Sequence, residues 1–335
     1  MGGSYMFDDN LVEKLVKAIK ISKGDKVLLQ LWGEDDYKEL LHKFSTAVKN
    51  NGAIPIEYQH SRIHYKNLFA EAEEKEINKE SFQCFKEVDV VVDLCACAPV
   101  RPHDEFPKEK LDLYRSYMKR LFEVLATKEK FVQLRIPTSE NALESALNEE
   151  EYKVRMVKAY DIDYDKLYIK AKSLVGDLEK NTATTIITGD NEKLSLSLKD
   201  RAWYIDAGDG DLPCGEVYIA PVENSAEGSI LIDQVFLDDV KIEGLRLEFK
   251  EGKIVNSNSD IFNEFLETLP PSSDILCEFG IGLNENVTEI IGYTPLDEKA
   301  SGTYHIAIGA NSMFGGKNNC NFHMDFVFYG KVEFE

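Results

Sequence analysis

The feature that most constrains the fold is an alternation of amphipathic and short apolar segments across the first 178 residues. Residues 11–21 carry Leu, Val and Ile at helical spacing, and a Lys-Gly-Asp turn separates them from the apolar run at 27–32. Short, largely apolar strands between amphipathic helices are typical of a parallel sheet that is covered on both faces. The same alternation predicts helices at 37–49 and 108–127 and strands at 54–58, 88–94 and 131–136.

The pattern changes after about residue 178. Short segments with frequent Gly, Asp and Asn turns between them follow at 184–187, 194–198, 230–232 and 245–249. The segment at 194–198 alternates strictly between apolar and polar residues, as a half-buried strand does. We therefore predict an α/β domain with a mostly parallel sheet over 1–178 and a β-rich, barrel-like α+β domain over 179–335. One helix is expected near 260–269, and another at about 163–178 is expected to bridge the two halves.

The charge of the chain limits its partners. Lys and Arg number 39 against 60 Asp and Glu, so the formal net charge is −21. Nucleic acids and anionic membranes are bound through concentrated Lys and Arg, so neither partner is expected. The apolar runs are of strand length, no signal-peptide pattern opens the chain, and the six cysteines include no CxxC pair. We expect a cytoplasmic protein with reduced thiols, among them Cys95 and Cys97 on one apolar strand.

Polar residues that can carry chemistry gather in the second half, beside Gly and Pro. Their segments are 206–217, 277–284, 297–309 and 315–316 with 322–326. His305 and His323 are the only two of the six histidines in this half, and both lie in apolar, strand-like sequence where a polar side chain needs a partner. The His-x-Asp spacing puts His323 and Asp325 on one face of a strand. Imidazole and carboxylate are suitable ligands for zinc, cobalt, manganese or iron, so these segments predict a metal site.

Together these segments resemble the aminopeptidase T and aminopeptidase S family of bacterial metallopeptidases, of the thermophilic leucyl aminopeptidase type. The motifs that carry the resemblance are DxGDGxLPCGEV at 206–217, the Glu before Gly-Ile-Gly at 280–282, LDEK with GTxHIAxG at 296–309, and HxD at 323–325. The first half is similar more loosely. The resemblance implies an α/β N-terminal domain, a β-rich C-terminal domain and a homodimer. It also implies ligands for two metal ions, which fall on Glu216, Glu278, His305, His323 and Asp325.

The activity implied by this resemblance is that of a metal-dependent aminopeptidase. Two divalent ions (Zn, Co or Mn) would activate a water for attack on the scissile carbonyl and hold the free α-amine of a peptide substrate. Glu216 and Glu278 are the catalytic candidates, because a carboxylate must carry the proton to the leaving amine. Glu298 is a candidate partner of the ligands. We expect a broad preference for apolar N-terminal residues such as Leu or Met, because no charged specificity feature is evident.

One departure from the family bears on the function. The family places a Tyr a few residues after the first His, whereas residues 310–313 of this chain read Ala-Asn-Ser-Met. An alternative function is that of a mononuclear iron dioxygenase that cleaves the ring of a dihydroxypyridine, which the chain also resembles. His305, His323 and Asp325 would suffice to hold its iron, but Glu278 stands where that enzyme has a His. A third possibility is a catalytically inactive relative that binds metal or peptide, which the missing Tyr favours and the five ligand-type residues oppose.

Overall fold

The computed structural model describes residues 7–73, 82–128, 130–145, 147–237 and 240–335. By their contacts the residues form two units, Met1–Asp161 with Gly208–Cys214 and Ile162–Ala207 with Gly215–Glu335. Helix α7 (Tyr164–Leu178), which we expected to bridge two halves, belongs to the second unit. It packs there against β7 (Trp203–Asp206) and β8 (Glu216–Ile219).

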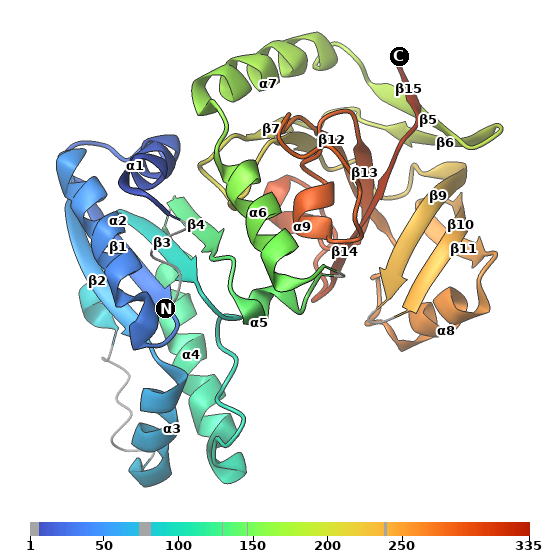
Figure 1. Cartoon of the computed structure of the whole chain (residues 1–335). Coiled ribbons are helices and arrows are strands. Elements are labelled where there is room, and N and C mark those ends of the chain that lie inside the picture. Colours follow the sequence, from blue (N-terminus) through green and yellow to red (C-terminus); the bar gives the residue numbers. More distant parts are fainter. Residues whose placement is uncertain (1–6, 74–81, 129, 146, 238–239) are drawn as a thin grey trace. The chain divides into compact units, whose positions relative to one another are not determined.

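The first unit is built on a four-stranded sheet in the order β2-β1-β3-β4, in which every pair is parallel (Figure 1). All six residues of β3 are buried, as expected for a strand that is covered on both faces. The predicted parallel sheet is therefore confirmed. Its strands are β1 (Lys26–Trp32), β2 (Ile54–His60), β3 (Val90–Cys95) and β4 (Lys130–Arg135).

Helices cover both faces of this sheet. Helix α1 begins where the Asp8 side chain accepts a hydrogen bond from the Leu11 amide, and its apolar stripe packs on α2, which lies against β1 and β2. On the other face, Leu28 and Val91 join a hydrophobic cluster with residues of α3 and α4. Helices α1, α2 and α4 were predicted, whereas α3, α5 and α6 were not. The bounds are α1 (Asp9–Ala18), α2 (Lys38–Asn50), α3 (Arg62–Glu71), α4 (Leu111–Leu125), α5 (Ser139–Ala142) and α6 (Glu149–Tyr160).

The second unit consists of two antiparallel sheets, with the orders β11-β10-β9-β6-β5-β15 and β14-β13-β12-β8-β7. The β-rich prediction is confirmed, in the form of two open sheets rather than one closed barrel. Besides β7 and β8, the strands are β5 (Ala183–Thr188), β6 (Glu192–Ser197), β9 (Glu227–Leu237), β10 (Val240–Lys250), β11 (Lys253–Ser257), β12 (Leu276–Gly282), β13 (Tyr304–Gly309), β14 (His323–Phe328) and β15 (Lys331–Phe334). Helices α8 (Asp260–Thr268), which was predicted, and α9 (Thr294–Asp297) complete the unit.

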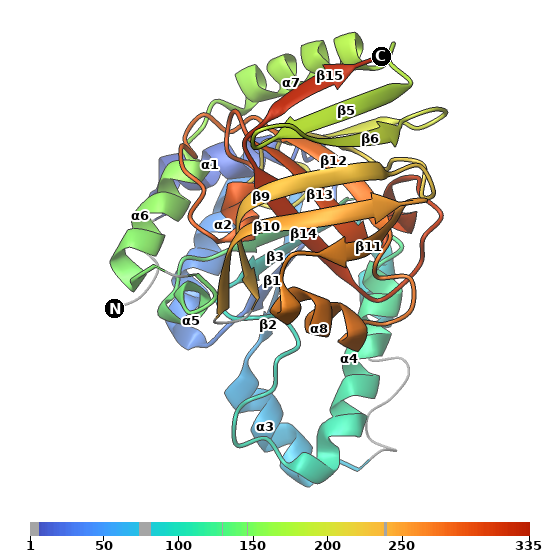
Figure 2. The ribbon, with the colours of Figure 1, turned by 90° about the vertical axis from the view of Figure 1, so that its right-hand side faces the viewer.

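The two sheets of the second unit pack face to face, and Figure 2 shows β9 and β10 in front of β12 and β13. Aromatic side chains join the layers. The rings of Phe279 in β12 and Phe334 in β15 lie 6.2 Å apart, and those of Phe262 in α8 and Phe326 in β14 lie 5.8 Å apart. This apolar packing fixes the five-stranded sheet on one side and leaves its other face for polar residues.

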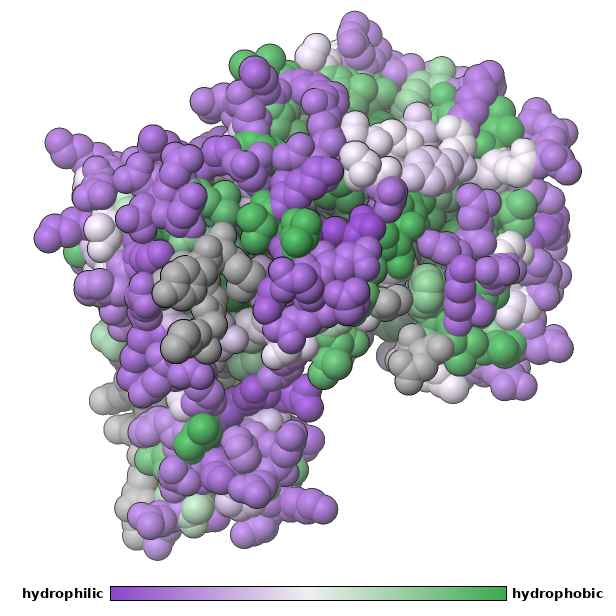
Figure 3. All heavy atoms as spheres, in the orientation of Figure 1, coloured by the Kyte–Doolittle hydropathy of each residue, from purple (hydrophilic) through white to green (hydrophobic). Residues whose placement is uncertain are grey.

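The surface agrees with the composition. Hydrophilic side chains cover most of the face shown in Figure 3, as expected for a chain in which 30% of residues are charged. All six cysteines are free thiols, and Cys95 and Cys97 are buried. Among the described residues, no helix has the length and apolar character that crossing a membrane requires.

Candidate metal centre

The five predicted ligands all lie on the five-stranded sheet of the second unit. Glu216 begins β8, Glu278 lies in β12, His305 in β13, and both His323 and Asp325 in β14. Residues far apart in the sequence meet here because β12 and β13 pair in the middle of the sheet, with β8 and β14 on either side of them. Side chains on one face of neighbouring strands lie close enough to share a metal ion.

Glu278 lies between the two histidines. Its Oε1 is 3.4 Å from His305 Nε2, and its Oε2 is 3.6 Å from His323 Nε2. His305 Nε2 is also 3.5 Å from Glu216 Oε2, while His323 Nε2 is 3.4 Å from Asp325 Oδ1. Ligand atoms of Glu278, His305 and Asp325 all lie within 4.8 Å of one another. Three of the five predicted ligands thus lie within reach of one metal ion, whereas Glu216 and His323 are near this group through the contacts just given.

The hydrogen bonding of these groups fits a divalent metal ion. Both ring nitrogens of His305 and Oε2 of Glu216 are buried and have no hydrogen-bond partner among the described residues. An unpartnered buried polar atom costs about 1–3 kcal/mol, which a bound cation would offset. His323 Nδ1 donates to the carbonyl oxygen of Ala310 at 3.0 Å, so Nε2, which faces Glu278 and Asp325, is the nitrogen that can bind a metal ion once it has lost its proton. This tautomer, held by a backbone carbonyl, is the form in which histidine binds metals.

Two glycines of the recognised motifs have a steric role. Gly280 pairs with His305 across β12 and β13, and a Cβ at position 280 would lie 2.0 Å from His305 Nε2. Gly215 precedes Glu216 with φ +129°, and a Cβ there would lie 2.8 Å from Asn284 Cβ. A side chain at either position would displace the strand or the ligand beside it.

Negative charge dominates the site. Burial by itself lowers the pKa of His305, but Glu278 and Glu216 outweigh burial and raise it to about 9. Burial likewise opposes the charged form of His323, yet Asp325 and other neighbours raise its pKa to about 12. Burial raises the pKa of Glu216 to about 8, although Lys299 acts in the opposite direction. The negative charge of the carboxylates holds protons on the imidazoles and also attracts metal cations. Protons and metal ions therefore compete for the imidazole nitrogens.

Lys299 belongs to the site, although no prediction from the sequence included it. Its Nζ lies 2.5 Å from Glu216 Oε1, 2.9 Å from Glu298 Oε1 and 3.7 Å from Asp206 Oδ2. The Lys299 side chain is only 6% exposed, so it is a buried cation among buried carboxylates. Glu298, predicted as a partner of the ligands, binds Lys299. The available signal was its place in the LDEK motif at 296–299, directly after Glu298.

The segment without the expected tyrosine supports the ligands through its backbone and an amide. The carbonyl of Ala310 accepts the hydrogen bond from His323, as described above. The Asn311 side chain is buried and donates to the carbonyl oxygen of Cys277, 3.2 Å away. Residues 310–311 therefore connect β14 to β12 next to Glu278.

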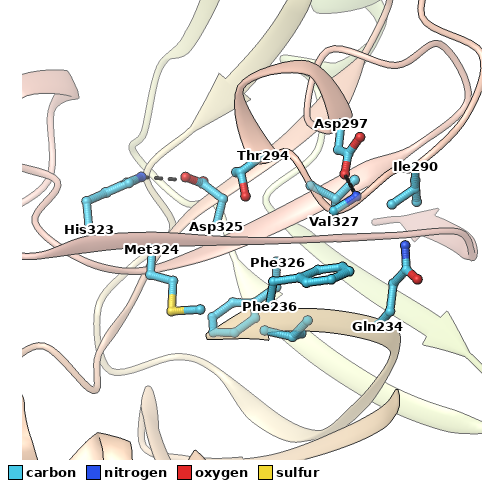
Figure 4. A pocket seen from close by; sticks show the side chains of 12 residues that line it. Gln234, Phe236, Ile290, Thr294, Asp297, His323, Met324, Asp325, Phe326 and Val327 are labelled. Carbon is cyan, nitrogen blue, oxygen red and sulfur yellow. Dashed lines mark hydrogen bonds and ion pairs between the residues drawn. The ribbon is translucent and has the colours of Figure 1, made fainter. Parts of the chain in front are cut away.

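A pocket of about 350 Å³ opens beside His323 and Asp325 (Figure 4). Among its polar members, Asp297 accepts hydrogen bonds from the amides of Ile291 and Gly292 at 2.9 and 2.7 Å, and these hold the pocket wall in place. Its apolar members come from β9, β14 and the loop before α9: Val235, Phe236, Ile290, Met324, Phe326 and Val327. Figure 4 shows Met324, Phe326 and Phe236 on the opposite side of β14 from His323 and Asp325, so the pocket can accept an apolar group at this strand, across it from the candidate ligands.

Candidate histidine and carboxylate ligands on a buried sheet face, next to a pocket, are typical of a metalloenzyme. The chain matches the model of the family described as thermophilic metalloprotease (M29) over residues 14–328, and it belongs to this family. The predicted family and the prediction of a metal-dependent peptidase are thereby confirmed. The family implies a divalent metal ion and a peptide substrate.

Two solved structures share the fold over nearly the whole chain. Wild-type AmpT from Thermus thermophilus is 18% identical, with a TM-score of 0.67, and the match covers 97% of each chain. The 2,5-dihydroxypyridine dioxygenase from Pseudomonas putida is 13% identical, with a TM-score of 0.62, over 99% of this chain and 94% of the other. These likenesses confirm the predicted fold class. A search of curated proteins found no match.

Proposed function

We propose that this metallopeptidase is an aminopeptidase that releases apolar N-terminal residues, such as Leu or Met, from peptides. Its ligands are the predicted set Glu216, Glu278, His305, His323 and Asp325. The observation that carries the proposal is the position of Glu278, whose two oxygens face the Nε2 atoms of two different histidines.

The arrangement around Glu278 supports two ions. Glu216 and His305 lie on one side of this carboxylate, and His323 and Asp325 lie on the other. Five imidazole and carboxylate groups exceed the needs of one tetrahedral ion, and such ligands suit zinc, cobalt or manganese. In a mononuclear iron site Glu278 and Glu216 would be surplus, which favours the hydrolase over the dioxygenase alternative.

The residues of the site then divide the work of hydrolysis. Bound divalent ions supply an acidified water and polarise the scissile carbonyl. Glu216 and Glu278 are the carboxylates in position to take the proton of that water and to return it to the leaving amine. Burial raises the pKa of Glu216 to about 8 in the absence of metal, and bound cations would lower it, so the carboxylate would be charged when the ions are present. Lys299 forms an ion pair with Oε1 of Glu216, so Oε2 of Glu216 faces His305.

The surroundings support a substrate with a free amine and an apolar first side chain. The excess of carboxylates favours an ammonium group, whereas an N-acylated terminus brings no positive charge. The pocket that His323 and Asp325 help to line offers Phe236 and Met324, on the other side of β14, to an apolar side chain (Figure 4). Its volume of about 350 Å³ exceeds the space that a single Leu or Met side chain needs.

Two further expectations complete the proposal. Six free thiols, including the buried Cys277 beside His323, suit the reducing cytoplasm. A homodimer is expected from the resemblance to the aminopeptidase T and S family. Size-exclusion chromatography with light scattering tests the dimer, for which a mass near twice 38.0 kDa is expected.

Metal analysis of the purified protein tests the ligand set. We expect two equivalents of zinc, cobalt or manganese in the wild type and a loss of metal in His305→Ala and His323→Ala, with circular dichroism unchanged. His42→Ala, on an exposed side chain of the first unit, is the matched control and should retain both equivalents. Wild-type metal content in both site variants would contradict the assignment.

Substrate pairs test the reaction. Leucine amide should be hydrolysed and N-acetyl-leucine amide should not, and Glu278→Ala should lose both metal and hydrolysis. Equal cleavage of the two amides would exclude an aminopeptidase. One equivalent of iron, with oxygen uptake on a dihydroxypyridine, would establish the dioxygenase instead. Absence of bound metal and of both activities would identify an inactive relative.

A further inference from the structure

A phenol lies on the ligand-bearing face of the five-stranded sheet. Tyr218 follows Glu216 by two residues in β8, so the two side chains share a face of the strand. Tyr218 pairs with Gly280 of β12, and Gly280 pairs in turn with His305 of β13. Residues directly opposite in paired strands present their side chains on the same face. Tyr218 and His305 therefore lie on either side of Gly280, which has no side chain.

Neighbouring rings hold the Tyr218 ring on this face. The ring of Tyr204 in β7 stacks on it at 5.6 Å with an interplanar angle of 22°. Phe314 meets it edge to face at 5.4 Å and 80°. The ring of Phe314 also lies 6.3 Å from the imidazole of His323. Phe314 thus links the phenol to the His323 end of the candidate metal centre.

The phenol hydroxyl is free to act as a donor. Four charged groups lie close enough to Tyr218 to influence it electrostatically, namely Glu216, Asp206, Glu278 and Lys299. In the described part of the chain, no residue forms a hydrogen bond with the hydroxyl. A phenol is protonated at neutral pH, since its ordinary pKa is about 10. Tyr218 therefore presents an O–H group at a site where the ligand side chains are mostly acceptors.

We propose that Tyr218 is a catalytic residue whose phenol donates a hydrogen bond to the scissile carbonyl oxygen as negative charge develops on it. The proposal rests on the peptidase function proposed above. During hydrolysis the water oxygen bonds to the carbonyl carbon, the carbon–nitrogen bond breaks, and a water proton passes through a carboxylate to the leaving amine. The phenol keeps its own proton throughout. It stabilises the transition state because a preorganised donor is aimed at the developing charge.

The variant Tyr218→Phe tests this role, because it removes the hydroxyl and keeps the ring contacts with Tyr204 and Phe314. We expect kcat for leucine amide to fall by about 100-fold, the loss typical of one such donor, with KM and bound metal unchanged. Tyr204→Phe is the matched control. Tyr204 lies in the same row of the sheet, one strand farther from His305, and is 37% exposed. Its kcat should remain at the wild-type value.

A binding measurement supplies a readout that does not depend on turnover. The phosphonate analogue of leucine carries tetrahedral, negatively charged oxygens like those of the transition state. By calorimetry its affinity should weaken about 10- to 100-fold in Tyr218→Phe, as expected for a lost hydrogen bond to a charged group, and should not change in Tyr204→Phe.

The outcomes separate this inference from the function on which it rests. If the wild type hydrolyses leucine amide and Tyr218→Phe matches it in kcat and phosphonate affinity, the role of Tyr218 is wrong and the peptidase function stands. If Tyr218→Phe loses metal, Tyr218 is a structural residue and the inference is also overturned. If the wild type hydrolyses no substrate with a free amine, both proposals fall.

Discussion

Replacing Lys299 with Met tests whether the buried carboxylates of the site depend on one ammonium group. Lys299 Nζ lies 2.5 Å from Glu216 and 2.9 Å from Glu298, whose side chains are 8% and 17% exposed. Removing one partner of a buried ion pair costs about 3–5 kcal/mol, because the remaining charge has neither water nor a counter-ion. We expect this cost to appear in the free energy of unfolding of the metal-free protein at a pH high enough for Glu216 to be ionised in the wild type.

The loss should depend on pH in a defined direction. Even with Lys299 present, burial raises the pKa of Glu216 to about 8, above its unfolded value of about 4.3. When folding raises the pKa of a carboxyl group, the group does not destabilise the folded protein below its unfolded pKa. The stability of the protein then falls as the pH rises from the unfolded pKa to the folded pKa. Without the ammonium group this pKa rises further, so the folded variant keeps its proton at pH values where the folded wild type releases it. The variant should therefore lie close to the wild type at pH 5 and fall below it by about 1.4 kcal/mol per pH unit above pH 8.

Urea denaturation of the chelator-treated proteins, followed by circular dichroism and fluorescence at pH 5 and pH 10, measures the effect. Lys170→Met is the matched control, because Lys170 and Glu285 form a 2.8 Å ion pair in the same unit whose side chains are 42% and 75% exposed. Such an exposed pair contributes at most about 1 kcal/mol. At pH 10, a loss in Lys299→Met no larger than that of the control would refute the reasoning, and so would an equal loss at pH 5 and pH 10.

Three further predictions concern the ligands, the pocket and the first unit. Gly280→Ala should displace His305 and reduce the bound metal measured by mass spectrometry, whereas Gly176→Ala, whose Cβ meets nothing within 4 Å, should retain it; equal metal content would contradict the steric role. Phe236→Ala should widen the pocket and shift kcat/KM from leucyl toward phenylalanyl amides by about 10-fold, and an unchanged ratio would exclude the pocket from substrate binding. Burial raises the pKa of Asp93 to about 7, so wild-type stability should fall by about 1.4 kcal/mol per pH unit between pH 4 and 7 relative to Asp93→Asn. Urea denaturation at pH 5, 6 and 7 measures this difference, and a constant difference would count against it.

Local properties of the sequence determined the elements and the types of ligand. Helical spacing in 11–21 and the apolar run at 27–32 report burial directly, so α1 and β1 were predicted close to their observed bounds. His305 and His323 stood out because a polar residue in an apolar strand requires a partner. The motifs around them carried the family resemblance. Each of these signals lies within a few residues of the chain, where periodicity and composition are informative.

Only the tertiary structure decided which distant residues meet. The pairing of Gly280 with both Tyr218 and His305 sets the spacing of the site, and strand register depends on contacts between segments that no local pattern specifies. Lys299 was not among the predicted site residues, and only its burial against Glu216 assigns it to the site. The second half read as a barrel, because alternation reveals that one face of a strand is buried but not which sheet covers it. The packing of two layers against each other, and not the local sequence, determined that these strands form two sheets instead of a barrel.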